Sequence, residues 1–384
     1  MSKPLAQQSD MSRASEVVAP RSASLVLAMR AASWLAGLVA LLPSLLFVPA
    51  ASAQELVLRL GVEGDERPYR LVESAEGADL AFRLQAQGAY TQRLGSTRHA
   101  LGGQAEASAR KYLALQDADQ LLVRAGLRHV WAFAPGWRWS AQTRWSERAE
   151  RGGWLDHRMV GGSGRLAWRA LDAVVVAVGA GWTRFLYFPE RRFDAAGPDA
   201  QLEVQLLGEL WTMTLQGDMA WRRVAEQALA REGDVVSLSE MPRHDTVQTL
   251  RLMAAWELGS ALLEGGGELA LQRSNSHGRD HSRAGAHVAL TALLWGDWLG
   301  RAALRWSQVD LRDPVALDEE ALLEGESRLR LHGALEHPLW GEGLWGELRY
   351  TFTHNRAAGQ GVGALRRQFV GLYVVWRPGA SSED

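Results

Sequence analysis

The segment from 80 to 90 reads Leu-Ala-Phe-Arg-Leu-Gln-Ala-Gln-Gly-Ala-Tyr, and its apolar and polar side chains alternate. Leu80, Phe82 and Leu84 share one face of an extended chain, whereas Arg83 and Gln85 share the other. Because successive side chains of a β-strand point to opposite sides of the sheet, this alternation predicts a strand. The segment is longer than the five or six residues of an ordinary soluble strand. It therefore predicts a long strand with one apolar face.

The same period of two returns in fifteen further segments, which gives sixteen candidate strands in total. The further segments are 55–62, 99–113, 120–133, 137–148, 157–168, 173–188, 201–211, 214–224, 246–258, 262–273, 285–295, 298–311, 327–336, 344–354 and 365–376. The connections between them alternate between short and long. Short ones are made of tight-turn residues, as at 134–136, 171–172, 259–260 and 296–297. Long ones are 63–78, 189–200, 225–245, 274–284, 312–326 and 355–364.

The composition excludes several classes of protein. Of the 384 residues, 47% are hydrophobic and 22% are charged, which fits neither a disordered chain nor a bundle of membrane helices. The 42 basic and 44 acidic residues nearly cancel, so binding of nucleic acid through global charge is not expected. The chain contains no Cys, which excludes zinc ribbons, thiol catalysis and disulfides. Lys3 and Lys111 are the only lysines, so the basic residues are almost all Arg.

An export signal precedes the strands. Residues 31–48 form an uncharged apolar run, with Arg30 before it and Ala51-Ser52-Ala53 after it. A basic start, an apolar core and a small-x-small exit predict a signal peptide over 1–53, cleaved after Ala53. The alternative is an uncleaved transmembrane anchor, but Pro43 within the run and the Ala-Ser-Ala exit favour cleavage. The compact signal that opens at Met29 suggests translation from that residue.

The tryptophans gather beside the short connections. Indole combines an apolar body with one N–H donor and prefers the membrane–water boundary, so this placement predicts an aromatic girdle at one rim. The alternative, Trp filling the strand ends of a β-sandwich core, would not favour one end of the strands. Trp139 lies one pleat further in. The predicted girdle consists of Trp131, Trp137, Trp168, Trp211, Trp256, Trp295, Trp298, Trp340, Trp345 and Trp376.

Taken together, the pattern over 54–384 resembles that of Gram-negative outer-membrane β-barrel proteins of porin size. The resemblance is to a class, since no motif of a single family supports it. It implies an all-β fold: a transmembrane antiparallel up-and-down barrel of about 16 strands over 54–376, with short periplasmic turns and long extracellular loops. It also implies export to the outer membrane and contact with lipid and lipopolysaccharide. Residues 377–384 extend as a short tail beyond the final strand, which ends in Trp376.

If the apolar face meets lipid, the other face lines the lumen. Inward acids are then Glu203, Glu209, Asp218, Glu257, Glu264, Glu268, Glu336 and Glu347. Inward arginines are more numerous, and rings of Arg select anions by their field. The alternative is that each Arg pairs with a carboxylate and stiffens the wall. The predicted pore-lining arginines are Arg59, Arg83, Arg124, Arg128, Arg138, Arg144, Arg165, Arg222, Arg251, Arg301, Arg305, Arg328, Arg330 and Arg349, with 301, 305, 328 and 330 as the densest patch.

No catalytic constellation is recognised, and neither an enzyme nor a cofactor is expected. Gly161-Gly-Ser-Gly164 is not a nucleophile motif and reads as a Gly-rich strand that allows close packing. His277 and His281 have zinc-like spacing but lie in a loop, so no metal site is predicted. Three functions remain: an anion-biased channel for small solutes, the outer-membrane port of an export machine such as one for polysaccharide, and a structural envelope anchor with a plugged lumen. The solute, the oligomeric state and any periplasmic partner stay open.

Overall fold

The computed structural model describes residues 52–66, 78–94, 98–151, 156–188, 191–233, 235–312, 326–341, 343–357 and 365–378. The predicted signal peptide lies outside these residues except for its last two positions, Ser52 and Ala53, which belong to the first strand. Cleavage after Ala53 therefore stays a prediction.

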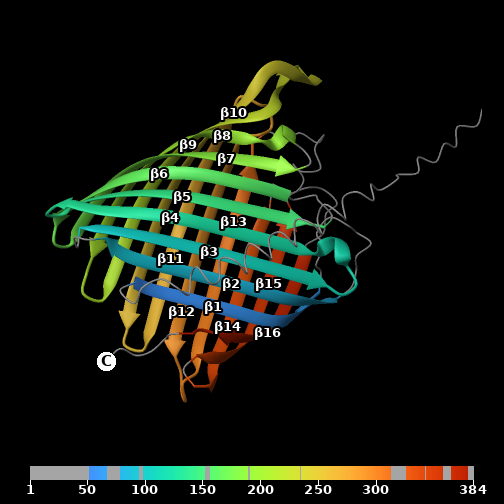
Figure 1. Ribbon diagram of the computed structural model, residues 1–384. Helices are drawn as coiled ribbons and strands as arrows, with labels where there is room; N and C mark the ends of the chain where they lie inside the picture. Colours follow the sequence, from blue (N-terminus) through green and yellow to red (C-terminus); the bar gives the residue numbers. More distant parts are fainter. Residues whose placement is uncertain are drawn as a thin grey trace, which may run out of the picture. The chain divides into compact units, whose positions relative to one another are not determined.

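Sixteen antiparallel strands form one closed barrel, in which each strand pairs with its neighbours in sequence and β1 pairs with β16 (Figure 1). The predicted fold class and strand number are thus confirmed. The strands are β1 Ser52–Asp65, β2 Asp79–Leu94, β3 His99–Tyr112, β4 Gln120–Ala134, β5 Trp137–Glu150, β6 Asp156–Leu171, β7 Val174–Phe188, β8 Ala195–Leu207, β9 Trp211–Glu232, β10 Val235–Leu258, β11 Ala261–Ser274, β12 His281–Leu293, β13 Leu299–Leu311, β14 Glu326–Trp340, β15 Leu344–Ala357 and β16 Leu365–Trp376. Two short 3-10 helices, η1 Gln116–Ala118 and η2 Arg191–Phe193, lie in the connections before β4 and β8.

The register keeps the apolar faces of all strands on one side. Leu60 of β1 lies opposite Leu84 of β2, and Leu304 of β13 lies opposite Leu331 of β14. These leucines remain exposed, because no other part of the described chain covers them. Cross-strand partners point to the same face of a sheet, so alternation within each strand becomes one continuous apolar outer surface. The opposite parity, which carries the arginines, forms the inner wall.

Tight turns close one end of the barrel. Gly136, Gly259, Gly296 and Asp297 have φ values of 75°, 64°, 59° and 66° and lie at the predicted short connections. A left-handed backbone at these positions matches the twist of a two-residue hairpin, which is why glycine is found there. Among the described residues, no helix is long and apolar enough to span a membrane.

The predicted loop over 225–245 is wrong, because the structure has a strand hairpin there. β8 pairs with β9 only as far as Val224, and β11 pairs with β10 only as far as Asp245. Beyond these points β9 and β10 pair with each other and project past their neighbours, as the yellow ribbon at the top of Figure 1 shows. The connection between β11 and β12 also bonds to this hairpin, where the His277 amide donates to the Leu229 carbonyl at 2.8 Å. Residues 225–232 have little apolar–polar contrast, so their period is weak in sequence. Although the period is weak, backbone hydrogen bonds between β9 and β10 and the turn at Gly233 stabilise the hairpin.

Candidate functional site

The arginines predicted to line the pore all lie on the inner wall. Arg59 lies opposite Gln85, Arg124 opposite Glu106, and each position has the parity opposite to that of the outer leucines. The wall also carries carboxylates that the sequence reading missed, namely Glu63, Asp65, Glu106 and Asp199. Glu63, Asp65 and Asp199 lie beyond the predicted strand limits, and Glu106 lies in a low-contrast Ala/Gly-rich strand.

One predicted inward acid, Glu209, does not lie on the inner wall. It was predicted to point inward from a strand, but it lies in the connection between β8 and β9. Inward arginines were missed as well, namely Arg110, Arg283 and Arg367. What decides the charge of the wall is how the groups pair.

A buried polar cluster closes the seam between β1 and β16. The Glu63 side chain is 0% exposed. It accepts a hydrogen bond from the Tyr373 hydroxyl at 2.6 Å and forms ion pairs with Arg83 at 3.2 Å and Arg110 at 2.6 Å. A buried carboxylate is stable only when charged and hydrogen-bonding partners satisfy it, as they do here. The cluster joins β1, β2, β3 and β16, so it fixes the strands that complete the barrel.

One carboxylate shared by two arginines is a recurring arrangement of the inner wall. A set whose arginines have no second carboxylate retains one net positive charge. The Glu268 set is neutral, because its Arg251 also pairs with Asp218. The sets beyond the seam cluster are Glu347 with Arg59 at 2.8 Å and with Arg349, Glu336 with Arg301 at 3.4 Å and Arg377 at 2.6 Å, and Glu268 with Arg251 at 2.7 Å and with Arg283.

Across β4–β10 the inner wall is hollowed. The hollow has a volume of about 520 Å³, and its lining is mainly polar. Its floor lies on β6 and β7, where Ser163 and Gly179 have the inward parity and carry only a small side chain or none. The Gly-rich segment noted in the sequence is therefore the reason that the lumen has a recess here. The charged side chains around it are Arg128, Arg144, Arg165, Arg222, Arg251, Asp199 and Asp218.

The arginines of the hollow differ in their partners. Arg251 bonds Asp218 at 2.8 Å, and Arg222 donates to the Gly197 carbonyl at 2.9 Å. Arg144 donates to the Thr183 hydroxyl at 3.2 Å and has no carboxylate within ion-pair distance in the described chain. Arg128 has no hydrogen-bonding or ionic partner among the described residues. The positive charge that lacks compensation thus lies at the β4–β5 side.

The four arginines of the densest predicted patch lie together on β13 and β14, but they differ in their partners. Arg305 lies directly opposite Arg330, whereas Arg301 pairs with Glu336. Arg328 donates to the Asn355 side chain at 3.1 Å. Arg305 has no carboxylate or hydrogen-bonding partner in the described parts of the chain, and the same holds for Arg138 on β5.

The tryptophans of the predicted girdle lie at the strand ends beside the short turns. Most are exposed on the outer face, and Trp137 stacks on Trp168 with ring centroids 5.6 Å apart. Trp345 is wrongly included in the predicted girdle, because it has the inward parity of Glu347 and lies opposite the buried Val375. Its ring is half-buried, with the Arg377 guanidinium 5.2 Å away. A role at a membrane boundary stays a prediction for the other tryptophans.

A second row of exposed tryptophans was missed by the sequence reading. Trp221 follows Trp211 by ten residues on β9, and Trp306 follows Trp298 by eight across β13. Trp182 lies at a similar height on β7. With a rise of 3.3 Å per residue and a tilt of about 40°, the rows are roughly 20–25 Å apart. That spacing is close to the height of the apolar band of an outer-membrane barrel.

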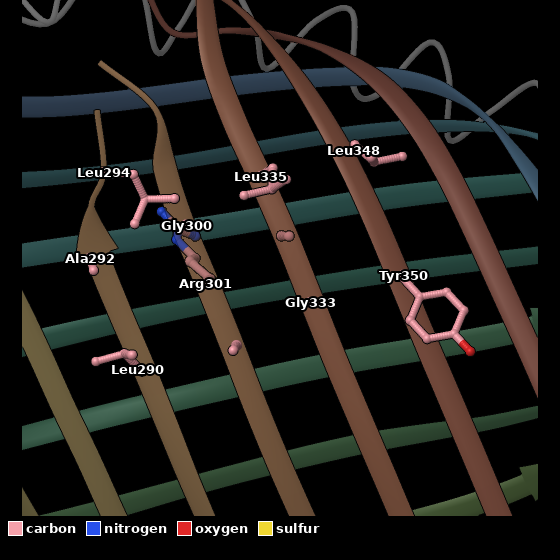
Figure 2. A pocket seen from close by; sticks show the side chains of 11 residues that line it. Leu290, Ala292, Leu294, Gly300, Arg301, Gly333, Leu335, Leu348 and Tyr350 are labelled. Carbon is pink, nitrogen blue, oxygen red and sulfur yellow. The ribbon is translucent and has the colours of Figure 1, made fainter. Parts of the chain in front are cut away.

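A different hollow, of about 420 Å³, lies on the apolar outer face over β12–β15. Figure 2 shows it between Leu290, Leu294, Leu335 and Tyr350, with the strands of the opposite wall behind. It exists because outward positions such as Gly333 have no side chain. Its lining offers almost no polar group, so it belongs to the apolar surface and is not the candidate site.

The described residues contain no group of three or more His, Asp or Glu that could hold a metal ion. Asp280, between the two loop histidines, accepts from the Ser274 amide at 2.7 Å and pairs with Arg273 at 3.3 Å. It therefore orders the connection between β11 and β12.

No family model matches the chain, and no curated protein matches it in sequence. Solved structures do match. The trimer form of OmpT, an outer membrane protein of Vibrio cholerae, has a TM-score of 0.50 and 13% identity, covering 85% of this chain and 99% of that one. This chain has the fold of an outer-membrane β-barrel. The class-level resemblance stated from the sequence is therefore confirmed.

Two further structures are similar at lower scores. The anion-selective porin from Comamonas acidovorans has a TM-score of 0.46 and 11% identity, covering 85% of this chain and 99% of that chain. A bacterial polysaccharide outer membrane secretin has a TM-score of 0.40 and 10% identity, covering 84% of this chain and 98% of that chain.

Proposed function

We propose that the protein is an outer-membrane channel that passes small solutes and favours anions. The observation that carries the proposal is the sharing of one wall carboxylate by two arginines at Glu63, Glu347 and Glu336, together with Arg138 and Arg305, which have no carboxylate partner among the described residues. Structural pairing of this kind leaves a net positive wall. A positively lined aqueous pore concentrates anions and repels cations, and salt weakens the bias as the Debye length shortens to about 10 Å at 0.1 M.

The outer surface supports insertion in the outer membrane. Exposed leucines such as Leu84, Leu250 and Leu372 would be costly in water over so large an area, whereas hydrocarbon accommodates them. The two rows of tryptophan bracket this band, and in the topology usual for such barrels the short turns would face the periplasm and the long connections the outside. Lipid and lipopolysaccharide are then the contacts of the outer face, and the predicted signal peptide supplies the export route.

The proposal is tested by the reversal potential of the purified barrel in a planar bilayer under a KCl gradient. We expect anion preference in the unmodified protein. The double variant Arg138→Gln with Arg305→Gln should shift the reversal potential toward cation preference. Neither arginine has a carboxylate partner among the described residues, so the substitutions leave no acid unpaired. Arg273→Gln, on the outer face, is the matched control and should change nothing.

Two results would overturn the proposal. A barrel that does not conduct would favour the structural anchor or a plugged export port. Cation preference in the unmodified protein would show that acids such as Glu319, Glu320 and Glu324, which lie outside the described residues, neutralise the wall.

A further inference from the structure

We infer that the hollow on β4–β10 is a binding site for an acidic sugar, meaning a hydroxyl-rich molecule that carries a carboxylate or a phosphate. The inference deepens the proposed function and rests on it only in that the solute reaches the hollow through the lumen. It is argued from the placement, charge and chemistry of the side chains that line the recess.

Two arginines at the β4–β5 side are placed to hold one anionic group. Arg128 lies opposite Gln142, and Arg144 is two residues further along the same strand as Gln142. Arg128 and Arg144 are therefore diagonal neighbours on one face, at a typical separation of about 7–8 Å between their backbones. The Arg144 side chain reaches across β6 to Thr183 of β7, so an anionic group held by both arginines would lie between them, over β5 and β6.

The charge of these arginines is not compensated by the described chain. Arg144 donates only to the neutral Thr183 hydroxyl, and Arg128 has no partner. The group at the end of each of these side chains is a guanidinium cation. Its planar fork matches two oxygens of a carboxylate or phosphate, which gives such an anion an advantage over a spherical ion.

The arginines at the opposite side of the hollow are already occupied. Arg251 is held by Asp218 at 2.8 Å and Glu268 at 2.7 Å. Arg222 donates to the backbone carbonyls of Gly197 at 2.9 Å and Pro198 at 3.0 Å. The side of the hollow that carries Arg222 and Arg251 therefore presents hydrogen-bond acceptors and ion pairs, and its arginines are less available to a ligand. The geometry thus orients a ligand, with its acidic group toward β4–β5 and its remainder toward β8–β10.

The neutral lining fits hydroxyl groups. A simple anion would use the arginines alone, but hydroxyl and amide side chains surround the hollow, and Asp199 and Asp218 can accept from a ligand hydroxyl. The volume of about 520 Å³ lies within the usual range for small-molecule sites. The neutral polar side chains are Ser140, Gln142, Ser163, Thr183, Gln201, Gln216 and Thr249.

The test is calorimetric titration of the folded barrel in detergent with four probes. Glucuronate and glucose 6-phosphate are the acidic sugars, glucose lacks the charge, and acetate lacks the hydroxyls. We expect saturable binding of at least one acidic sugar, with glucose and acetate each weaker by roughly tenfold or more, the effect of losing one strong polar contact. The tighter of the two acidic sugars identifies the acidic group.

Variants locate the site. Arg128→Gln and Arg144→Gln should each weaken binding of the acidic sugar by roughly tenfold. Gln142→Leu should weaken binding of the sugar but not that of acetate, because it removes only hydroxyl recognition. Arg273→Gln removes an arginine from the outer face and should leave binding unchanged.

Acidic sugars that bind no better than acetate would overturn the inference, while an anion-selective reversal potential would still support the channel. Binding that survives Arg128→Gln with Arg144→Gln would also overturn it, because the ligand would then lie elsewhere. Conversely, a barrel that binds glucuronate at the hollow but prefers cations would keep the inference and refute the proposed selectivity.

Discussion

Arg305 of β13 lies directly opposite Arg330 of β14 on the inner wall of the barrel. Like charges in this position repel each other across the strand pair, whereas a shared carboxylate separates the arginines elsewhere on the wall. The repulsion lowers the stability of the wall at Arg305, which has no carboxylate partner among the described residues.

Arg305→Gln should stabilise the barrel at low salt by about 0.2–1 kcal/mol, because it removes the repulsion with Arg330. The gain should shrink as added salt screens the charges. Urea unfolding followed by tryptophan fluorescence measures both effects. Arg251→Gln is the contrasting variant and should destabilise, since it leaves Asp218 and Glu268 without their shared partner. Equal changes in both variants would show that the cross-strand repulsion is not felt.

Tyr373→Phe should lower the free energy of unfolding by about 1.5–3 kcal/mol, the usual contribution of a hydrogen bond to a charged group. The lost bond is the one that its hydroxyl donates to the buried Glu63 carboxylate. Tyr350→Phe is the matched control, because that hydroxyl donates at 3.3 Å to the neutral side-chain amide of Gln368 and not to a buried carboxylate. The midpoint of urea unfolding compares them, and equal midpoints would contradict a stabilising seam cluster.

Gly61→Ala should impair folding, whereas Gly333→Ala should not. A Cβ at Gly61 would lie 2.2 Å from the Tyr373 ring and 2.5 Å from the Leu372 carbonyl oxygen, which cannot move away freely. A Cβ at Gly333 would meet nothing within 4 Å. The yield of the heat-modifiable folded form after refolding into lipid vesicles measures the difference. Loss of yield in Gly333→Ala would indicate that the outer hollow has an occupant.

Leu84→Arg should cost about 2–4 kcal/mol, the penalty for arginine on the lipid face of a barrel near the bilayer midplane. Gln87→Arg on the same strand should be tolerated, since it points inward and lies opposite Glu106. Stability is compared by urea unfolding in vesicles. Equal tolerance of both changes would mean that the assignment of the two faces is wrong.

The mature protein should begin at Gln54. Mass spectrometry of protein purified from outer membranes should show the loss of residues 1–53. An intact N-terminus, or recovery with inner membranes, would contradict the exported barrel.

Much of the fold could be predicted because the local alternation of apolar and polar residues determines the strands. Alternation such as that of Leu80, Phe82 and Leu84 decides both that a strand forms and which face is apolar, without reference to any distant residue. The sixteen strands follow from sixteen such segments, and the tight turns that join alternate pairs make those neighbours antiparallel. The inward parity of residues such as Arg83 and Arg128 follows from the same period.

What only the tertiary structure decided depends on register and closure. The sequence shows Glu63 and Tyr373 at opposite ends of the chain, and only the pairing of β1 with β16 brings them to 2.6 Å. The sequence likewise shows a Gly-rich segment in β6, but its function as the floor of a hollow beneath Arg128 and Arg144 requires the stagger of neighbouring strands. Period-two alternation is blind to shifts of two residues, because every such shift preserves the faces. The partners of each charge are therefore set by the closed hydrogen-bonded barrel, whereas the faces are set by the chain itself.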